Sequence, residues 1–402
     1  MTSPTAPGQL SASAGSRNEQ TRRHNLSTVL TLVHHGGSTS RADLTRLTGL
    51  NRSTIGALTA ELAAARLVYE SPAPEAGTVG RPSPLVNPNS DIVAIAINPD
   101  IDAIEVAIVS LGGVVVSRVR QATDTIPTPE EATRIAASLV KSLVAGLGEG
   151  RIVVGVGAAI PGLVHANNGV VARAPHLDWT DVAWGSQLAE VLGYPVAVGN
   201  DASIAVVAVA AFGAGQGSTH LMYLNGSSSG IGGGVMVDGS RLVGADGFAG
   251  ELGHTLVSSG GEACHCGRRG CLETEVNLSR LYAAARESGI DPAIVLEYLA
   301  APKASALRDE VDRQADMLAF AIANLISVFN PEAVVLGGFL GDLYDAREDR
   351  ILKGVLADAF APLADHVRID RAKLGDNLLM VGAAELAFTP LLHDPAGWFA
   401  GT

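Results

Sequence analysis

The sequence is poor in cysteine and has no long apolar run. Its 402 residues include three cysteines. No apolar segment reaches the ~18 residues that a membrane-spanning helix requires, so we expect no membrane partner. The first twenty residues lack the apolar core of a signal peptide, which predicts that the chain is not secreted.

All three cysteines lie in one segment, residues 250–275, which reads GELGHTLVSSGGEACHCGRRGCLETE. They are Cys264, Cys266 and Cys271, and His254 precedes the first of them by ten residues. Three thiolates and one imidazole complete a closed zinc site, whereas inert core thiols would not gather beside a histidine. The segment therefore predicts one structural Zn²⁺ per chain. Thiols that serve a metal indicate a reducing cytoplasm.

Two carboxylates flank the four expected ligands. Glu251 precedes His254, and Glu273 follows Cys271 by two residues. A zinc-fixed loop would hold both carboxylates rigidly, and ionised carboxylates accept hydrogen bonds from hydroxyl groups. The residues alone leave open whether these are ligand-binding groups or solvated surface acids.

Charge is divided unevenly along the chain. Residues 1–90 hold 8 Lys and Arg against 5 Asp and Glu, and the remainder holds 20 against 36. A mildly basic head therefore precedes an acidic body. The total length predicts two or three domains.

The head begins with a polar segment and continues with helical periodicity. Residues 1–18 are rich in Ser, Ala, Pro and Gly, which predicts a disordered tail. From Arg22, apolar residues recur at helical spacing until Gly36 and predict a first amphipathic helix. Its expected core positions are Leu26, Val29, Leu30 and Val33.

Two shorter helices are predicted next. Ser40 is a plausible N-cap for the second, whose expected core residues are Leu44 and Leu47 and which Gly49 ends. Asn51 is the expected cap of the third. The inward positions of the third helix are Ile55, Leu58 and Leu62.

Three short helices with a glycine-containing turn indicate a helix-turn-helix. Arg52, Ser53 and Thr54 begin the third helix and are the expected DNA contacts in the major groove. Two short apolar runs, 67–70 and 85–86, predict the strands of a wing, whose loop offers Arg81 to a minor groove. A small helical oligomerisation module is the alternative, but the local positive charge favours operator DNA.

The body alternates strands and helices, which indicates an α/β fold. A predicted strand at 195–198 leads into Asn200 and Asp201, and a helix then runs to about residue 212. An Asp in this position is either an ordinary helix cap or a site residue at the carboxyl end of a strand. The Gly/Ser-rich stretch 225–234 is either a phosphate cradle or a glycine hairpin.

GELGH followed by CHCGRRGCLE resembles the signature of the ROK family, which comprises sugar kinases and sugar-responsive repressors. The resemblance extends from about residue 22 to 390 and implies a two-lobed actin-like ATPase fold after a winged helix-turn-helix. It also implies that Asn200, Asp201, Glu251, His254 and Glu273 bind a sugar, with His254 also a zinc ligand. In the family's kinases the residue matching Asp201 is the general base.

The expected domains follow from these segments. They are a tail at 1–18, a winged helix-turn-helix at 19–88, a small α/β lobe at 89–200 with 383–395, and a large α/β lobe at 201–382 that carries the zinc loop.

One departure from the family pattern bears on activity. The family's kinases have D-x-G-G-T in the first phosphate loop, where this chain has Asn98-Pro99-Asp100-Ile101. Proline removes an amide donor and the carboxylate would repel polyphosphate, so we expect kinase activity to be lost and Asp201 to be a vestigial base.

We therefore expect a regulator, acting as a repressor of carbohydrate metabolism. It would bind an inverted-repeat operator as a homodimer or homotetramer and respond to a sugar or sugar derivative, or to a protein partner. The alternative is a glucokinase-like, ATP-dependent sugar kinase with a regulatory DNA-binding head.

Overall fold

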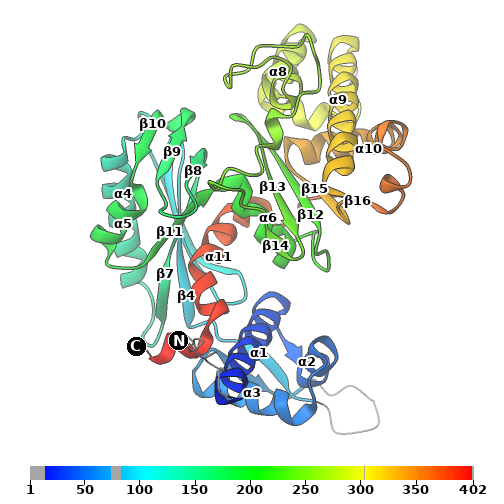
Figure 1. The fold of residues 1–402 in the computed structure, drawn as a ribbon. Coiled ribbons are helices and arrows are strands. Elements are labelled where there is room, and N and C mark those ends of the chain that lie inside the picture. Colours follow the sequence, from blue (N-terminus) through cyan, green and yellow to red (C-terminus); the bar gives the residue numbers. More distant parts are fainter. Residues whose placement is uncertain (1–13, 74–82, 303, 401–402) are drawn as a thin grey trace, which may run out of the picture. The chain divides into compact units, whose positions relative to one another are not determined.

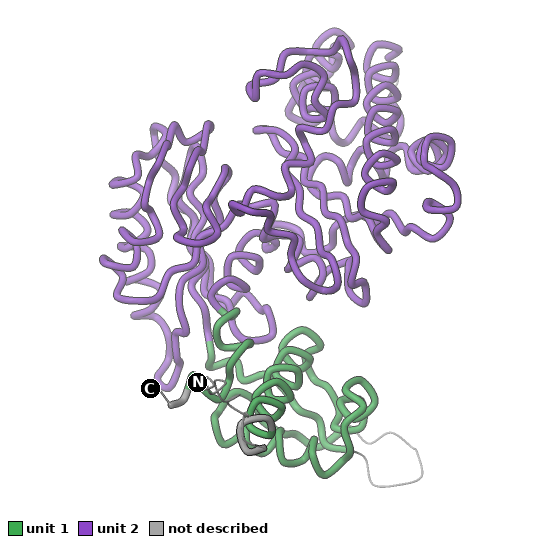
Figure 2. Tube along the Cα trace, viewed as in Figure 1, with its two compact units in different colours: residues 1–92, 388–402 green, residues 93–387 purple. Residues whose placement is uncertain are grey.

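The computed structural model describes residues 14–73, 83–302 and 304–400. Two compact units are present: Met1–Ile92 together with Phe388–Thr402, and Val93–Ala387 (Figure 2). The first is called the head and the second the body. The C-terminal segment from Phe388 thus groups with the head, whereas we expected residues 383–395 in the small lobe.

The head is a helical cluster with a small antiparallel sheet (Figure 1). The sheet has the order β1-β3-β2, so the two predicted wing strands pair with each other and a short strand before α2 pairs with the second of them. The head's elements are α1 (Ala14–Gly36), β1 (Thr39–Ser40), α2 (Arg41–Thr48), α3 (Arg52–Ala64), β2 (Val68–Ser71), β3 (Leu85–Pro88) and α12 (Pro395–Ala400).

Side-chain caps explain where the two short helices of the head begin. The hydroxyl of Ser40 accepts a hydrogen bond from the backbone N–H of Asp43, and Asn51 caps α3 through the N–H of Thr54. Gly49 ends α2 with the left-handed conformation that glycine adopts without strain. The predicted starts of both helices are confirmed.

Three expectations about the head differ from the structure or fall outside it. Helix α1 begins at Ala14, inside the stretch expected to be a tail, because a helix extends easily once formed and Glu19 pairs with Arg22 and Arg23. Leu47 is exposed, since only Leu44 of the short α2 is buried. Residues 1–13 and Arg81 lie outside the described residues.

The first part of the body is a five-stranded mixed sheet of order β11-β7-β4-β5-β6. Its strands β4, β5 and β7 are almost wholly buried, as the continuous apolar runs predict. The elements are β4 (Ile92–Pro99), β5 (Ala103–Ser110), β6 (Val114–Ala122), α4 (Pro129–Ala145), β7 (Ile152–Ile160), α5 (Trp184–Leu192) and β11 (Val196–Asn200). A smaller sheet contains β8 (Leu163–Val164), β9 (Val171–Ala174) and β10 (Trp179–Val182).

The second part of the body has another five-stranded sheet, of order β14-β13-β12-β15-β16. Its strands are β12 (Leu221–Ser227), β13 (Gly230–Val237), β14 (Ser240–Arg241), β15 (Ala333–Gly338) and β16 (Arg368–Arg371). The helices of this part are α6 (Asp201–Phe212), α7 (Leu272–Glu275), α8 (Leu278–Glu287), α9 (Ser305–Phe329) and α10 (Phe339–Asp358). Two sheets of this kind confirm the expected α/β architecture.

Helix α11 (Leu378–His393) packs closely on the first sheet of the body. A β-carbon on Gly157 of β7 would lie 1.7 Å from the carbonyl oxygen of Ala383, so only glycine permits this approach. Among the described residues, no helix combines the length and apolarity needed to cross a membrane.

Candidate functional site

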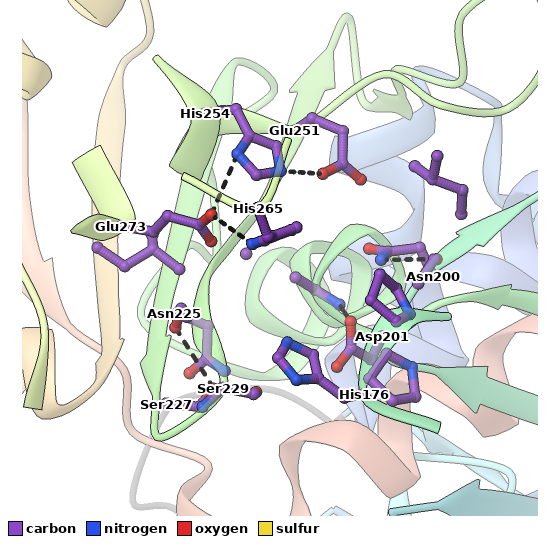
Figure 3. Close-up of a pocket in the computed structure, with 18 of the residues that line it drawn as sticks. His176, Asn200, Asp201, Asn225, Ser227, Ser229, Glu251, His254, His265 and Glu273 are labelled. Atoms are coloured by element: carbon purple, nitrogen blue, oxygen red, sulfur yellow. Dashed lines mark hydrogen bonds and ion pairs between the residues drawn. The ribbon is translucent and has the colours of Figure 1, made fainter. Parts of the chain in front are cut away.

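Polar side chains from both five-stranded sheets of the body surround one cavity of about 370 Å³ (Figure 3). The cavity is lined by every residue that the sequence suggested for a sugar: Asn200, Asp201, Glu251, His254 and Glu273. It also contains the Pro161-Gly162 turn and the glycine-rich hairpin. Segments more than 100 residues apart in the chain therefore meet at this cavity, which lies within the usual size range of ligand sites.

Asn200 and Asp201 lie where β11 ends and α6 begins. The side-chain oxygen of Asn200 caps the helix by accepting from the N–H of Ser203 at 2.8 Å. Its amide nitrogen donates to the carbonyl oxygen of Gly162 at 3.1 Å, which joins the helix start to the Pro161-Gly162 turn. Asn200 is thus both the N-cap and a lining residue. Asp201 is the first residue of the helix and not its cap, so of the two alternatives raised for Asp201 the N-cap is wrong.

The surroundings of Asp201 raise the pKa of its carboxyl group. Burial raises its pKa to about 7, and the charges of Glu251 and Asp100 act in the same direction. The backbone N–H of Ala202 donates to its carboxylate at 2.7 Å and partly opposes the rise. Its ionisation therefore changes close to neutral pH, and with it the ability to accept a hydrogen bond from a hydroxyl.

His254 connects the two acidic residues of the zinc segment. Its Nδ1 lies 3.2 Å from Glu273, and its Nε2 lies 3.8 Å from Glu251. Glu273 is nearly buried, with a side chain 9% exposed, and also contacts His265 at 3.3 Å. One wall of the cavity is therefore a cluster of two carboxylates and two imidazoles within ion-pair distance of one another.

The cysteine segment brings four potential metal ligands together. Ligand atoms of His254, Cys264, Cys266 and Cys271 all lie within 4.8 Å of one another. Such a donor set could hold a metal ion. The turn between the cysteines uses left-handed glycines, with φ of 89° at Gly267, and the backbone N–H of Arg268 lowers the pKa of Cys266 to about 7.

A second possible ligand group overlaps with the first. His254, His265 and Glu273 also have ligand atoms close to one another. The thiolate-rich group fits a soft, tetrahedral ion better, because it supplies four protein ligands with three sulfurs. His254 belongs to both groups, so an ion bound to the thiolates would direct its ring.

The glycine-rich stretch is a β-hairpin. Strands β12 and β13 pair from Leu221–Met236 to Ser227–Gly230, with a two-residue turn at Ser228 and Ser229. Gly230 has a φ of 141°, and a β-carbon there would lie 2.6 Å from the carboxylate of Glu273. The hairpin and the acidic wall are therefore in contact at a position that requires glycine.

Residues 98–101 stand where the family's kinases have their first phosphate loop, and their amide groups are hydrogen-bonded within the protein. Asn98 is buried and donates to the carbonyl oxygen of Ala159 at 2.9 Å, which links β4 to β7. The N–H of Asp100 donates to Ala103, and the N–H of Ile101 donates to the side chain of Asp100. Because Pro99 has no N–H, this turn offers few donors to a phosphate.

In the head, Arg52, Ser53 and Thr54 form the first turn of α3. Arg52 is exposed and makes no ion pair with any described residue, whereas Arg22, Arg41 and other head arginines pair with carboxylates. The hydroxyl of Ser53 donates to the cap residue Asn51 at 2.6 Å, and Thr54 is half-buried. Arg52 is therefore the most available of the three.

Some cavity residues were not singled out from the sequence. Arg173 and His176 come from β9 and the turn after it, whereas Asn225, Ser227 and Ser229 belong to the Gly/Ser-rich stretch that the sequence did point to, though not as sugar-binding residues. His265 had a detectable signal, since it stands between two of the expected ligands. Arg173 and His176 had none, because their segment carries no distinctive spacing.

Comparisons with known proteins agree with this architecture. A profile of the ROK family matches residues 94–389. The xylose repressor of Caldicellulosiruptor bescii is 26% identical over 378 residues, which cover 89% of this chain and 93% of that protein. The glucokinase of Thermotoga maritima is 34% identical over 258 residues, which cover 60% of this chain and 75% of the enzyme.

A solved structure extends the likeness to the head. The crystal structure of a ROK family transcriptional regulator, a homologue of the E. coli MLC protein, has a TM-score of 0.75 and 24% identity. The match covers 93% of this chain and 97% of that structure. At this identity the likeness concerns the fold. It spans nearly the whole chain, whereas the glucokinase aligns with only part of it.

Proposed function

Because the chain belongs to the ROK family, we propose that it is a transcriptional regulator of carbohydrate metabolism that represses transcription. In this proposal the head binds operator DNA and the cavity of the body binds a sugar or sugar derivative. The observation that carries the proposal is the combination of a capped helix-turn-helix with a family body, aligned over nearly the full length of a xylose repressor.

The sugar would be held by hydrogen bonds to the acidic wall and to the start of α6. Glu251, His254 and Glu273 form one side, and Asn200 and Asp201 form the other. Carboxylates are strong acceptors for hydroxyl groups, and the amide of Asn200 is fixed by its bonds to the backbone. The effector changes DNA binding only if it favours one conformation of the chain over another.

A structural Zn²⁺ would be held by His254, Cys264, Cys266 and Cys271, one ion per chain. Four protein ligands leave no open position, so the ion would stabilise the loop and carry out no chemistry. With the ion bound, the ring of His254 and the neighbouring Glu273 would be fixed in the cavity wall.

We expect no sugar kinase activity. In the turn at Asn98 to Ile101, the N–H groups of Asp100 and Ile101 already donate hydrogen bonds to groups of the protein. Asp100 also places a negative charge where phosphate would approach. Phosphoryl transfer depends on positioning and charge neutralisation, and this turn supplies neither. The glucokinase alternative is supported by Asp201, which lies at the cavity as a general base would.

DNA binding by Arg52, Ser53, Thr54 and Arg81 would be two-fold symmetric. A homodimer or homotetramer presents paired recognition helices, so its operator would be an inverted repeat. The test begins with the full chain and a random duplex library. Selected sequences should contain an inverted repeat, and a xylose or glucose titration should change the gel-shift midpoint. Selection of no sequence would contradict the proposal.

A further inference from the structure

A second cavity, of about 450 Å³, adjoins the first on the side of the hairpin and the zinc loop. The two cavities share five lining residues: Ser227, Ser229, Gly230, His265 and Glu273. The second cavity continues over the start of α8, where Ser279 and Ala283 line it, and neither of these residues lines the first. The two spaces are therefore neighbours with a common wall.

The boundary between the two cavities includes a glycine and a carboxylate that can accept hydrogen bonds. The carboxylate of Glu273 lies against Gly230, which has no side chain to raise the wall. Glu273 lines both cavities. A single carboxylate can accept several hydrogen bonds, so Glu273 could bond hydroxyl groups on both sides.

The outer wall of the second cavity is polar, and its arginine is already paired with carboxylates. Ser228 and Ser279 are exposed, and their hydroxyls form no hydrogen bond with other described residues. Arg280, the one basic lining residue apart from His265, bonds to Glu310 at 3.0 Å and lies 3.9 Å from Glu262. Its charge is thus already balanced by carboxylates.

This charge distribution favours a neutral, hydroxyl-rich ligand over a nucleotide. Glu262 and Glu273 both line the second cavity and would repel a polyphosphate, and Arg280 is not free to offset them. Hydroxyl groups of a carbohydrate, in contrast, can donate to the carboxylates and exchange hydrogen bonds with Ser228 and Ser279.

We propose that the effector is an oligosaccharide, with one sugar unit in the first cavity and the next unit in the second. This inference rests on the proposed sugar response and specifies its ligand class. The gain in affinity over a monosaccharide would come from the second unit.

The test is calorimetry on the full chain with matched probes: xylose, xylobiose, glucose, cellobiose and maltose. Ala283→Trp should fill the second cavity from α8, because Ala283 lines that cavity and does not line the first. Ala357→Trp is the matched control, since Ala357 is an exposed alanine of α10 that lines neither cavity.

At least one disaccharide should bind about tenfold more tightly than its own monosaccharide. Ala283→Trp should remove that gain and leave monosaccharide affinity within about twofold, and Ala357→Trp should change neither. The inference is overturned if disaccharides bind no more tightly than monosaccharides, if the gain survives Ala283→Trp, or if ATP displaces the disaccharide. Monosaccharide binding without a gain leaves the proposed function intact, whereas binding of no sugar overturns both.

Discussion

At the scale of single residues, Asp201 has the clearest consequence. Its pKa is raised from 3.8 to about 7 because it is buried near Glu251 and Asp100. The folded chain therefore holds a proton that the unfolded chain has lost, and the free energy of unfolding should fall as pH rises from about 4 to about 7. Asp201→Asn removes this cost, so it should stabilise the protein at pH 8 by about 1–3 kcal/mol and much less at pH 5. Thermal unfolding at both pH values measures the difference.

The same substitution separates a sugar-binding role of Asp201 from a purely structural role at the start of α6. If the Asp201 carboxylate accepts a hydrogen bond from the sugar, Asp201→Asn should weaken binding at pH 8 by about tenfold or more and flatten its dependence on pH. Wild-type affinity should fall as pH decreases through 7. Equal affinities would mean that the Asp201 carboxylate serves only the start of α6, where it accepts from the N–H of Ala202.

The residues that the sequence predicted well are those with short-range signals. Ser40 and Asn51 were found because a cap acts within three residues of itself. The exposure of Leu47 was missed because helical spacing does not say how wide the buried stripe of an eight-residue helix is. Arg173 and His176 were missed because only the folded chain brings β9 to the cavity.

At the scale of elements, the cysteine loop should depend on its metal. Elemental analysis of chelator-washed protein should find about one zinc per chain. Cys266→Ser should lower the metal content and the thermal stability, and weaken sugar binding through Glu273, because an incomplete ligand set no longer fixes the loop. Ser258→Ala, in the same loop but outside the ligand set, is the control. Folded wild-type protein without metal would contradict the assignment.

Helix α3 should carry the major-groove contact of the head. Arg52→Ala should weaken operator binding by about 1–3 kcal/mol, because Arg52 is exposed, forms no ion pair within the described part of the chain and is therefore available to a guanine. Arg46→Ala is a suitable control, since Arg46 already pairs with Asp43 at 3.1 Å. Gel shifts against the selected operator measure both, and circular dichroism checks folding. Equal effects of the two variants would argue against α3 as the recognition helix.

At the scale of the whole molecule, an assay of kinase activity distinguishes a sugar-responsive regulator from a sugar kinase. A coupled assay for ADP with magnesium ATP and glucose or xylose should show no release above background. In the turn at Asn98 to Ile101, the N–H groups of Asp100 and Ile101 are already bonded and Pro99 has none, so few donors are left for phosphate. A sugar kinase run in parallel provides the positive control. Turnover by the full chain would establish the enzyme alternative.

The strand and helix order of the body could be predicted because buried strands leave continuous apolar runs, as in β4 and β7. The grouping of Phe388–Thr402 with the head could not, since it depends on contacts far apart in the chain, such as Arg23 with Asp394 at 3.4 Å. A sequence window contains only one partner of such a contact.

Gly253 and Gly270 give the cysteine loop a property that a mutational scan would reveal. A β-carbon on Gly253 would lie 1.8 Å from the carbonyl oxygen of Ile231, and one on Gly270 would lie 1.7 Å from that of Ser258. At Gly253 the start of the loop packs directly against the backbone of strand β13. At Gly270 the end of the loop packs against its own earlier segment. Any side chain at either position would separate backbones that must touch. In a library of variants screened for loss of the response to sugar, every substitution at these two positions should therefore score as defective. Neither residue lines the cavity, so the defect would come from the displaced loop.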